Sequence, residues 1–178
     1  MKHEKFQSDY YRMMNKDYKF SFDTLMRMIA YPHLRFMYWW RKYEKSKSFL
    51  KRLILLKYTH KYGLEISPDA TIGDFFYLGH PYNITVGSGV ILGHHVNLHK
   101  GVTIGRENRG KREGSPRIGN YVWIGMNSTV VGNIHIGDDV LIAPNSFVNI
   151  DVPNHSVVIG SPAVIHSKDD AVKGYIGE

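Results

Sequence analysis

A six-residue spacing of aliphatic side chains is the feature that most constrains the fold of this chain. The spacing starts at Ile66, slips once by two residues before Val86, and resumes at Ile118 after a longer interruption. A period of six differs from both the helical period and simple strand alternation, and it is typical of a parallel β-helix. The aliphatic positions are Ile66, Ile72, Leu78, Val86, Leu92, Leu98, Ile104, Ile118, Ile124, Val130, Ile136, Ile142 and Val148.

The same spacing predicts how the coils are built. Three hexapeptides complete one triangular coil, so each aliphatic side chain points inward and stacks on the equivalent residue of the next coil. Small residues after the aliphatic ones, as in Ile72-Gly73 and Ile136-Gly137, let the chain turn each corner. We therefore expect a mainly β fold, a left-handed parallel β-helix of hexapeptide repeats with an N-terminal α-helical segment.

The period breaks in two places, and because a regular coil needs no insertion for stability, we expect function there. One break is the slip at Pro81–Thr85. The other is the interval from Ile104 to Ile118, whose glycine-rich and basic stretch 105–117 predicts an extruded loop.

The first 62 residues show no such repeat. Ser21 or Asp23 is a candidate cap for a helix over Thr24–Ala30, Pro32 begins a second helix, and Phe49–Tyr58 carries an apolar stripe. We expect two or three helices in 1–62, a catalytic β-helix over 63–165, and a C-terminal tail over 166–178.

Charge divides the chain in the same way. Residues 1–62 hold 15 Lys or Arg against 5 Asp or Glu, whereas residues 63–178 hold 8 against 11. This asymmetry favours contact of the N-terminal segment with an acidic surface or partner over nucleic-acid binding. Two interpretations of Phe36–Lys42 remain open: packing on the β-helix or on neighbouring subunits, or lying on anionic lipid.

Composition limits the chemistry and the location. Cysteine is absent, which excludes a disulfide framework, a thiolate metal site and a cysteine nucleophile. No run of about 18 apolar residues occurs, so we expect no membrane-spanning helix. The expected location is cytoplasmic, with peripheral contact at the inner face of the cell membrane as an open alternative.

Residues 63–163 resemble the serine acetyltransferase branch of the hexapeptide acyltransferases, including relatives that O-acetylate capsule and exopolysaccharide sugars. The resemblance rests on four anchors in order: the stretch from Glu65 to Gly73, the stretch from Leu78 to Pro81, the stretch from Leu98 to Gly105, and the exit from Asp151 to Ala163. It implies acetyl-CoA as co-substrate and a homotrimer with active sites between subunits.

By this resemblance His80 falls on the catalytic histidine and Glu65 on the aspartate that orients it. Acetyl transfer to an alcohol requires a base for the hydroxyl proton, and neutral imidazole suits that role near pH 7. A carboxylate at the other ring nitrogen fixes the tautomer and stabilises the imidazolium. Glutamate in place of aspartate departs from the family.

The acceptor side departs further. The family has charged residues, assigned by resemblance to serine binding, where this chain has Gly79, Gly114 and Ser115. We therefore expect a sugar of a surface polysaccharide or its precursor as acceptor, with serine O-acetylation or amino-sugar N-acetylation as alternatives. The expected acceptor-binding residues around His80 are Gly79, Tyr82, Asn83, His99 and Ser115.

For acetyl-CoA, the resemblance implies a groove between two subunits with small residues along it and basic residues at the phosphates. The expected binding residues are Arg106, Arg109, Lys111, Arg112, Gly125, Ala143 and Gly160, while Val164 replaces the basic residue that the family has near its end.

Two other classes of function remain as alternatives: a zinc enzyme using His94 and His99, and a non-catalytic scaffold. No third histidine stands at the spacing a zinc site needs, so no metal is expected.

Overall fold

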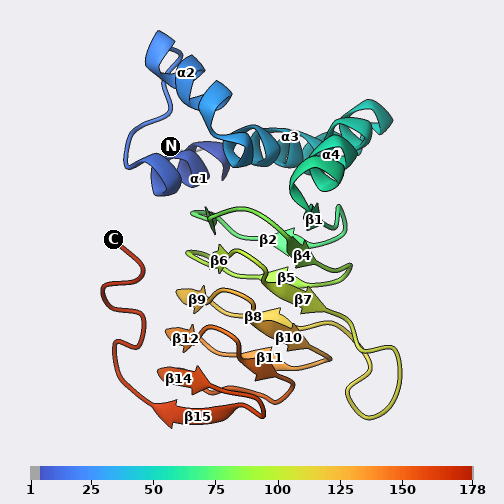
Figure 1. The fold of residues 1–178 in the computed structure, drawn as a ribbon, viewed down its shortest axis with the longest axis vertical. Coiled ribbons are helices and arrows are strands. Elements are labelled where there is room, and N and C mark those ends of the chain that lie inside the picture. The colour runs from blue at the N-terminus through green and yellow to red at the C-terminus, as the bar shows by residue number, and fades with distance from the viewer. Residues whose placement is uncertain (1–4, 178) are drawn as a thin grey trace.

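The structure, a computed structural model, describes residues 5–177 as a triangular β-helix capped at one end by helices (Figure 1). Four helices precede the first strand: α1 (Lys5–Met14), α2 (Phe22–Ala30), α3 (Pro32–Ser46) and α4 (Phe49–Tyr62). Ser21 caps α2, its hydroxyl accepting a hydrogen bond from the backbone N–H of Thr24. The segment therefore holds more helices than the two or three expected from the sequence.

Within residues 5–177, fifteen short strands form the three faces of the prism. The face that we call sheet A has the order β1-β4-β7-β10-β13, sheet B has β11-β8-β5-β2, and sheet C has β15-β14-β12-β9-β6-β3. The strands are β1 (Leu64–Ile66), β2 (Thr71–Ile72), β3 (Tyr77–Gly79), β4 (Ile84–Val86), β5 (Ile91–Leu92), β6 (Asn97–His99), β7 (Thr103–Gly105), β8 (Arg117–Ile118), β9 (Val122–Ile124), β10 (Thr129–Val131), β11 (His135–Ile136), β12 (Val140–Ile142), β13 (Phe147–Val148), β14 (Ser156–Ile159) and β15 (Val164–Ser167).

The expected stacking of aliphatic residues is confirmed on all three faces. Leu78 pairs with Leu98, Leu98 with Ile124, and Ile124 with Ile142 along sheet C. Each of these side chains is buried. The repeat thus builds one continuous apolar column per face, which fixes the order of the coils.

Glycines at one corner of the prism are required by close backbone approach. A Cβ atom on Gly73 would lie 2.4 Å from the carbonyl oxygen of Gly93 in the next coil. That distance is below any real Cβ contact, so the Ile-Gly steps of the repeat allow successive coils to stack at this corner.

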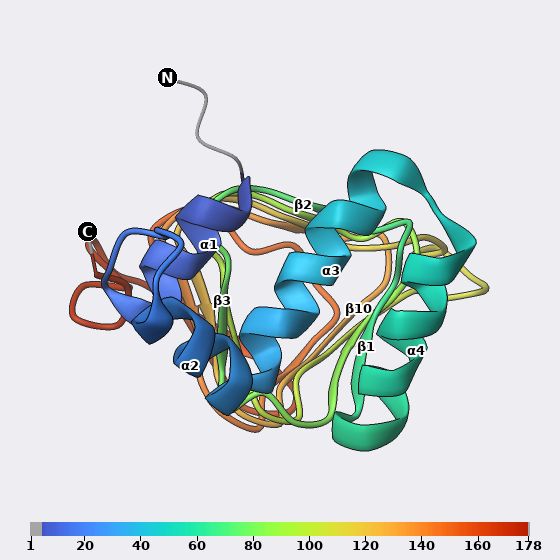
Figure 2. The same cartoon turned by 90° about the horizontal axis from the view of Figure 1, so that it is seen from above.

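Helix α3 closes the top of the prism and supplies its end cap (Figure 2). Phe36, Met37 and Trp40 are buried against the first coil. Sequestering these side chains from water removes the reason for them to lie on lipid. The interpretation of Phe36–Lys42 as a lipid-facing stretch is therefore wrong, and packing on the β-helix is correct.

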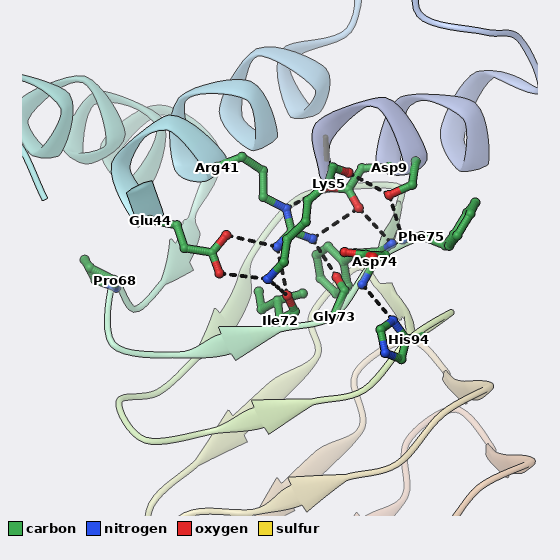
Figure 3. A network of polar contacts seen from close by, with 12 residues as sticks. Lys5, Asp9, Arg41, Glu44, Pro68, Ile72, Gly73, Asp74, Phe75 and His94 are labelled. Atoms are coloured by element: carbon green, nitrogen blue, oxygen red, sulfur yellow. Dashed lines mark hydrogen bonds and ion pairs between the residues drawn. The ribbon is translucent and has the colours of Figure 1, made fainter. Parts of the chain in front are cut away.

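A buried ion pair ties α1 and α3 to the first coil (Figure 3). Arg41 and Asp9 have 3% and 0% of their side chains exposed, and Arg41 Nε donates to Asp9 Oδ2 at 2.8 Å. The guanidinium also donates to the carbonyl oxygens of Ile72 and Gly73, and Asp9 accepts from the backbone N–H of Phe76. These bonds satisfy both charges, as burial demands.

The C-terminal tail returns along sheet C. Strand β15 is antiparallel to β14, and the following residues run up the outer face of the sheet (Figure 1). Ala171 and Val172 pack on Leu141 there, and the backbone carbonyl of Tyr175 accepts a hydrogen bond from Asn97. Within residues 5–177, no helix has the length and apolar character that crossing a membrane requires.

Candidate active site

His80 stands at the corner where sheet C passes into sheet A. It follows β3 directly, its side chain is exposed, and its backbone is left-handed with φ +49°. The two-residue slip holds this conformation, because Tyr82 N–H donates to the His80 carbonyl at 2.8 Å and Gly101 N–H donates to the Tyr82 carbonyl at 3.0 Å. An irregular, hydrogen-bonded corner thus presents the imidazole outside the repeat.

Glu65 lies at the start of sheet A, close in the fold to the same corner. It is the central residue of β1, pairs with Thr85 of β4, and points outward. Its side chain lines a groove of about 390 Å³ between α4 and sheet A. No hydrogen bond or ion pair joins the described Glu65 to His80, so the orienting role of Glu65 stays a prediction.

Gly79 and His99 form the wall beside His80. They are paired in the register of β3 and β6, and a Cβ atom on Gly79 would lie 2.4 Å from Nδ1 of His99. The His99 ring packs on Trp123, with ring centroids 4.7 Å apart, and near Tyr77 at 6.1 Å. Burial, and then the nearby His80, lower the pKa of His99 from its ordinary value, so this wall is neutral at physiological pH.

Tyr82 and Asn83 belong to the His80 corner and are exposed. The Tyr82 ring contacts Tyr62 edge-on at 5.9 Å. Asn83 has φ +55° and lies under Gly63, where a Cβ atom would come 2.5 Å from its side-chain oxygen. Both residues expected at the acceptor site therefore stand beside the candidate base.

The basic loop leaves the prism at a different corner, between sheet A and sheet B (Figure 1). Two of its cations bond within the loop: Arg106 to Glu113 at 3.3 Å and Arg112 to Glu107 at 3.1 Å. Arg109 and Lys111, also expected at the acetyl-CoA phosphates, are exposed and have no ion pair among the described residues.

Ser115 ends this loop and does not join the His80 corner of its own chain. Its hydroxyl donates to the carbonyl of Ser88 at 2.8 Å, which fastens the loop to the corner between sheets A and B. The expected acceptor-binding role of Ser115, in a site shared between subunits, therefore stays a prediction. The hexapeptide period already implies this separation, because His80 follows a strand of sheet C and the loop follows a strand of sheet A.

Small residues continue below His99 on the outer face of sheet C. Leu98 pairs with Ile124, and Ile124 pairs with Ile142, so Gly125 and Ala143, which follow these isoleucines, stand in one column with His99. Gly160 lies one residue beyond the end of β14, with φ +98°. The three residues expected along the pantetheine arm thus follow the sheet C edge that carries His80.

Trp123 and Tyr77 are site residues that the sequence reasoning missed. Both flank His99, and extending the register from Leu98–Ile124 would have placed Trp123 next to Asn97 and hence beside His99.

The zinc-enzyme alternative needs a cluster of metal ligands. No group of three or more metal-ligating side chains gathers within the described part of the chain. His94 instead accepts a hydrogen bond from the backbone of Asp74.

Comparisons with known proteins identify the repeats. Residues 115–149 match the family described as bacterial transferase hexapeptide, six repeats. A serine acetyltransferase of Staphylococcus xylosus is 38% identical over 129 residues, covering 71% of this chain and 59% of that protein. A serine acetyltransferase of Helicobacter pylori is 36% identical over 107 residues, covering 60% and 63%.

A solved structure agrees in fold over most of the chain. The serine acetyltransferase of Neisseria gonorrhoeae in complex with serine superposes with a TM-score of 0.75 and 26% identity, covering 92% of this chain and 68% of that one. This chain spans between 34% and 63% of the length of the curated relatives that it matches first. The likeness to this solved structure extends over most of the chain.

Proposed function

We propose that this chain, which has the repeats of the bacterial hexapeptide transferases and serine acetyltransferases as homologues, is an acetyl-CoA-dependent O-acetyltransferase. The observation that carries the proposal is the exposed His80 on its hydrogen-bonded corner. The relatives named above are serine acetyltransferases, so they favour L-serine as acceptor over the polysaccharide sugar that the sequence led us to expect.

In the proposed reaction, neutral His80 removes the hydroxyl proton while the acceptor oxygen attacks the thioester carbonyl. The C–S bond then breaks, and the imidazolium returns its proton to the sulfur, so the products are the O-acetyl ester and free CoA. Glu65 is proposed to stabilise the imidazolium from the sheet A side. The side chain of Glu65 points outward from sheet A, which leaves its carboxylate accessible for this role.

A sugar hydroxyl is the second candidate acceptor, and the composition of the site favours it. Gly79 and Gly114 carry no charge, and the Ser115 hydroxyl is engaged with Ser88. An amino-acid acceptor needs paired charges in a closed site, whereas a sugar needs neutral hydrogen-bond partners.

We propose a homotrimer with shared sites. The loop cations and His80 stand on different edges of one prism, so a site containing both takes the loop from a neighbouring chain. Arg109 and Lys111 are the exposed loop cations proposed to meet the nucleotide phosphates of acetyl-CoA. Contact of the N-terminal segment with a membrane surface would involve residues other than the buried ones of α3.

The test is an acetyl-transfer assay that follows thiol release and identifies the ester by mass spectrometry, with serine and a panel of hexoses as acceptors. His80→Ala should lower kcat by roughly 100-fold or more while acetyl-CoA binding stays unchanged, since general-base catalysis typically contributes 10²–10⁴. His94→Ala, which alters a surface histidine of the same prism, is the matched control.

Light scattering on the same samples checks the shared site. Near-normal turnover by His80→Ala would refute the assignment of the base. Full activity at a mass near the 20.5 kDa of one chain would refute the trimer.

A further inference from the structure

His99 is the polar side chain nearest in the fold to the residue that precedes the candidate base. The strand register places His99 directly beside Gly79, one coil below. Burial lowers the pKa of His99, and the nearby His80 lowers it further. Nothing in the proposed reaction uses His99. The position raises the question of why an imidazole is kept there.

The glycine at position 79 is explained by the position of the His99 ring. Its backbone is outside the left-handed region, so its conformation does not require glycine. What requires glycine is the His99 ring, because a Cβ atom at position 79 would lie 2.4 Å from Nδ1 and 2.5 Å from Cε1. The chain therefore gives up a side chain beside the base to make room for this imidazole.

The ring nitrogens of His99 supply the second observation. Both are buried in the described structure, and neither has a hydrogen-bond partner. Asn97 in the same strand is also buried, yet it bonds to Arg12 and to the carbonyl of Tyr175. A buried polar group without a partner is costly, and an apolar side chain would fill the same space without that cost.

Three residues surround the His99 ring. Trp123 covers one side of the ring, Tyr77 flanks it, and Gly79 lies against its edge. The side chain as a whole is still partly exposed. A turn about the Cβ–Cγ bond exchanges the positions of nitrogens and carbons in an imidazole, which allows a nitrogen to face an incoming ligand.

We propose that His99 is the acceptor-recognition residue of this site and that it hydrogen-bonds, as a neutral imidazole, the polar group next to the reacting hydroxyl. A neutral ring offers one donor and one acceptor. It therefore accepts from the ammonium of serine, or bonds to a neighbouring hydroxyl of a sugar. The inference rests on the proposed acetyl transfer and names the residue that selects its acceptor.

The test compares two substitutions of similar size. His99→Leu keeps the bulk and removes both nitrogens, and it should raise the KM for the acceptor roughly tenfold, the size of one lost hydrogen bond, with the KM for acetyl-CoA unchanged. His99→Gln keeps a hydrogen-bonding side chain and should recover most of that loss. His166→Leu, an exposed histidine on β15, is the matched control.

The pH dependence separates recognition from a structural role. Charged or titratable groups facing His99 are His80, Tyr77 and, over the Tyr77 ring, Arg12. Protonation of His99 below its lowered pKa should raise the KM for serine in the wild-type protein, but not in His99→Gln. An unchanged acceptor KM in His99→Leu, or an equal rise in the KM for acetyl-CoA, would overturn the proposal.

A binding measurement keeps the inference testable if no acetyl transfer is seen. With ¹⁵N-labelled histidine, adding serine or a hexose should shift the ring signal of His99 in the full chain without acetyl-CoA. Shifts confined to other histidines would reject the role of His99. Absence of transfer to every acceptor, together with a shift of His99, would instead reject only the proposed reaction.

Discussion

The β-helix and the helical segment before it are held together in opposite ways. In the β-helix every coil repeats the same contact, as Ile118 pairs with Ile136 and Leu92 with Ile118. The helical segment has no repeat and meets the first coil through the apolar side chains of α3 and through the buried pair of Asp9 and Arg41. The first arrangement spreads stability over many equivalent apolar contacts, whereas the second includes a single polar cluster whose charges depend on each other.

This contrast predicts how much stability each region loses when one side chain is substituted. A column of apolar contacts loses a little when one methyl group is removed, because neighbours above and below remain. A buried ion pair loses much when one partner is removed, because the other charge stays desolvated. Variants in the two regions should therefore differ in size of effect.

Removal of the Asp9 carboxylate should have the largest effect on stability. Asp9→Ala leaves the guanidinium of Arg41 buried without its main partner, and we expect a loss of about 3–5 kcal/mol in the free energy of unfolding. Urea titration followed by circular dichroism measures it. Asp17→Ala, which removes an exposed ion pair with Lys19, is the control and should cost less than about 1 kcal/mol. Equal losses in the two variants would break the contrast.

Trimming one residue of the β-helix column should have a smaller effect. Ile136 is fully buried and pairs with Ile118, so Ile136→Val should cost about 0.5–1.5 kcal/mol in the same titration. His135→Gln, on the outward face of the same strand, should leave the transition nearly unchanged. A loss for Ile136→Val as large as that for Asp9→Ala would mean that the column is no more tolerant than the polar cluster.

Removal of the ion pair between His155 and Asp139 of the β-helix should have the smallest effect on stability, and this effect should depend on pH. His155 Nδ1 lies 2.8 Å from Asp139 Oδ2, and this hydrogen bond raises the pKa of His155 above its ordinary 6.5. Burial alone would raise the pKa of Asp139, but His155 and the N–H groups of Val172 and Ala171 lower it below 3.8.

The direction of the pH dependence follows from the difference in pKa between the folded and the unfolded chain. The stabilisation from His155 is fully present below pH 6.5 and is lost as the pH rises through its raised pKa, while that from Asp139 is lost as the pH falls through its lowered pKa. The difference in Tm between wild type and His155→Gln should therefore be largest between about pH 4 and 6.5 and should vanish at alkaline pH. His166→Gln is the control, and a difference that grows with pH would contradict the pairing.

Sequence spacing predicted the β-helix because its contacts are periodic. A residue of the repeat meets its partner one coil away, so the positions of Leu78, Leu98 and Ile124 already specify which strands pair. The same register placed His99 beside Gly79. The helical segment was predicted less well, since the partners of Phe36 and Trp40 follow from no period, and their aromatic and basic neighbourhood suggested lipid.

By itself the sequence determined the coil, its two interruptions and the histidine at one of them, because period and insertion length are local properties of the chain. Only the tertiary structure decided that the Ser115 hydroxyl bonds to the carbonyl of Ser88, which ties the end of the loop to its own edge of the prism. It also decided that Arg41 is buried against Asp9 and that the His99 ring replaces a side chain at position 79. These contacts join residues 20 or more apart, where burial and shape fit, rather than spacing, determine what meets.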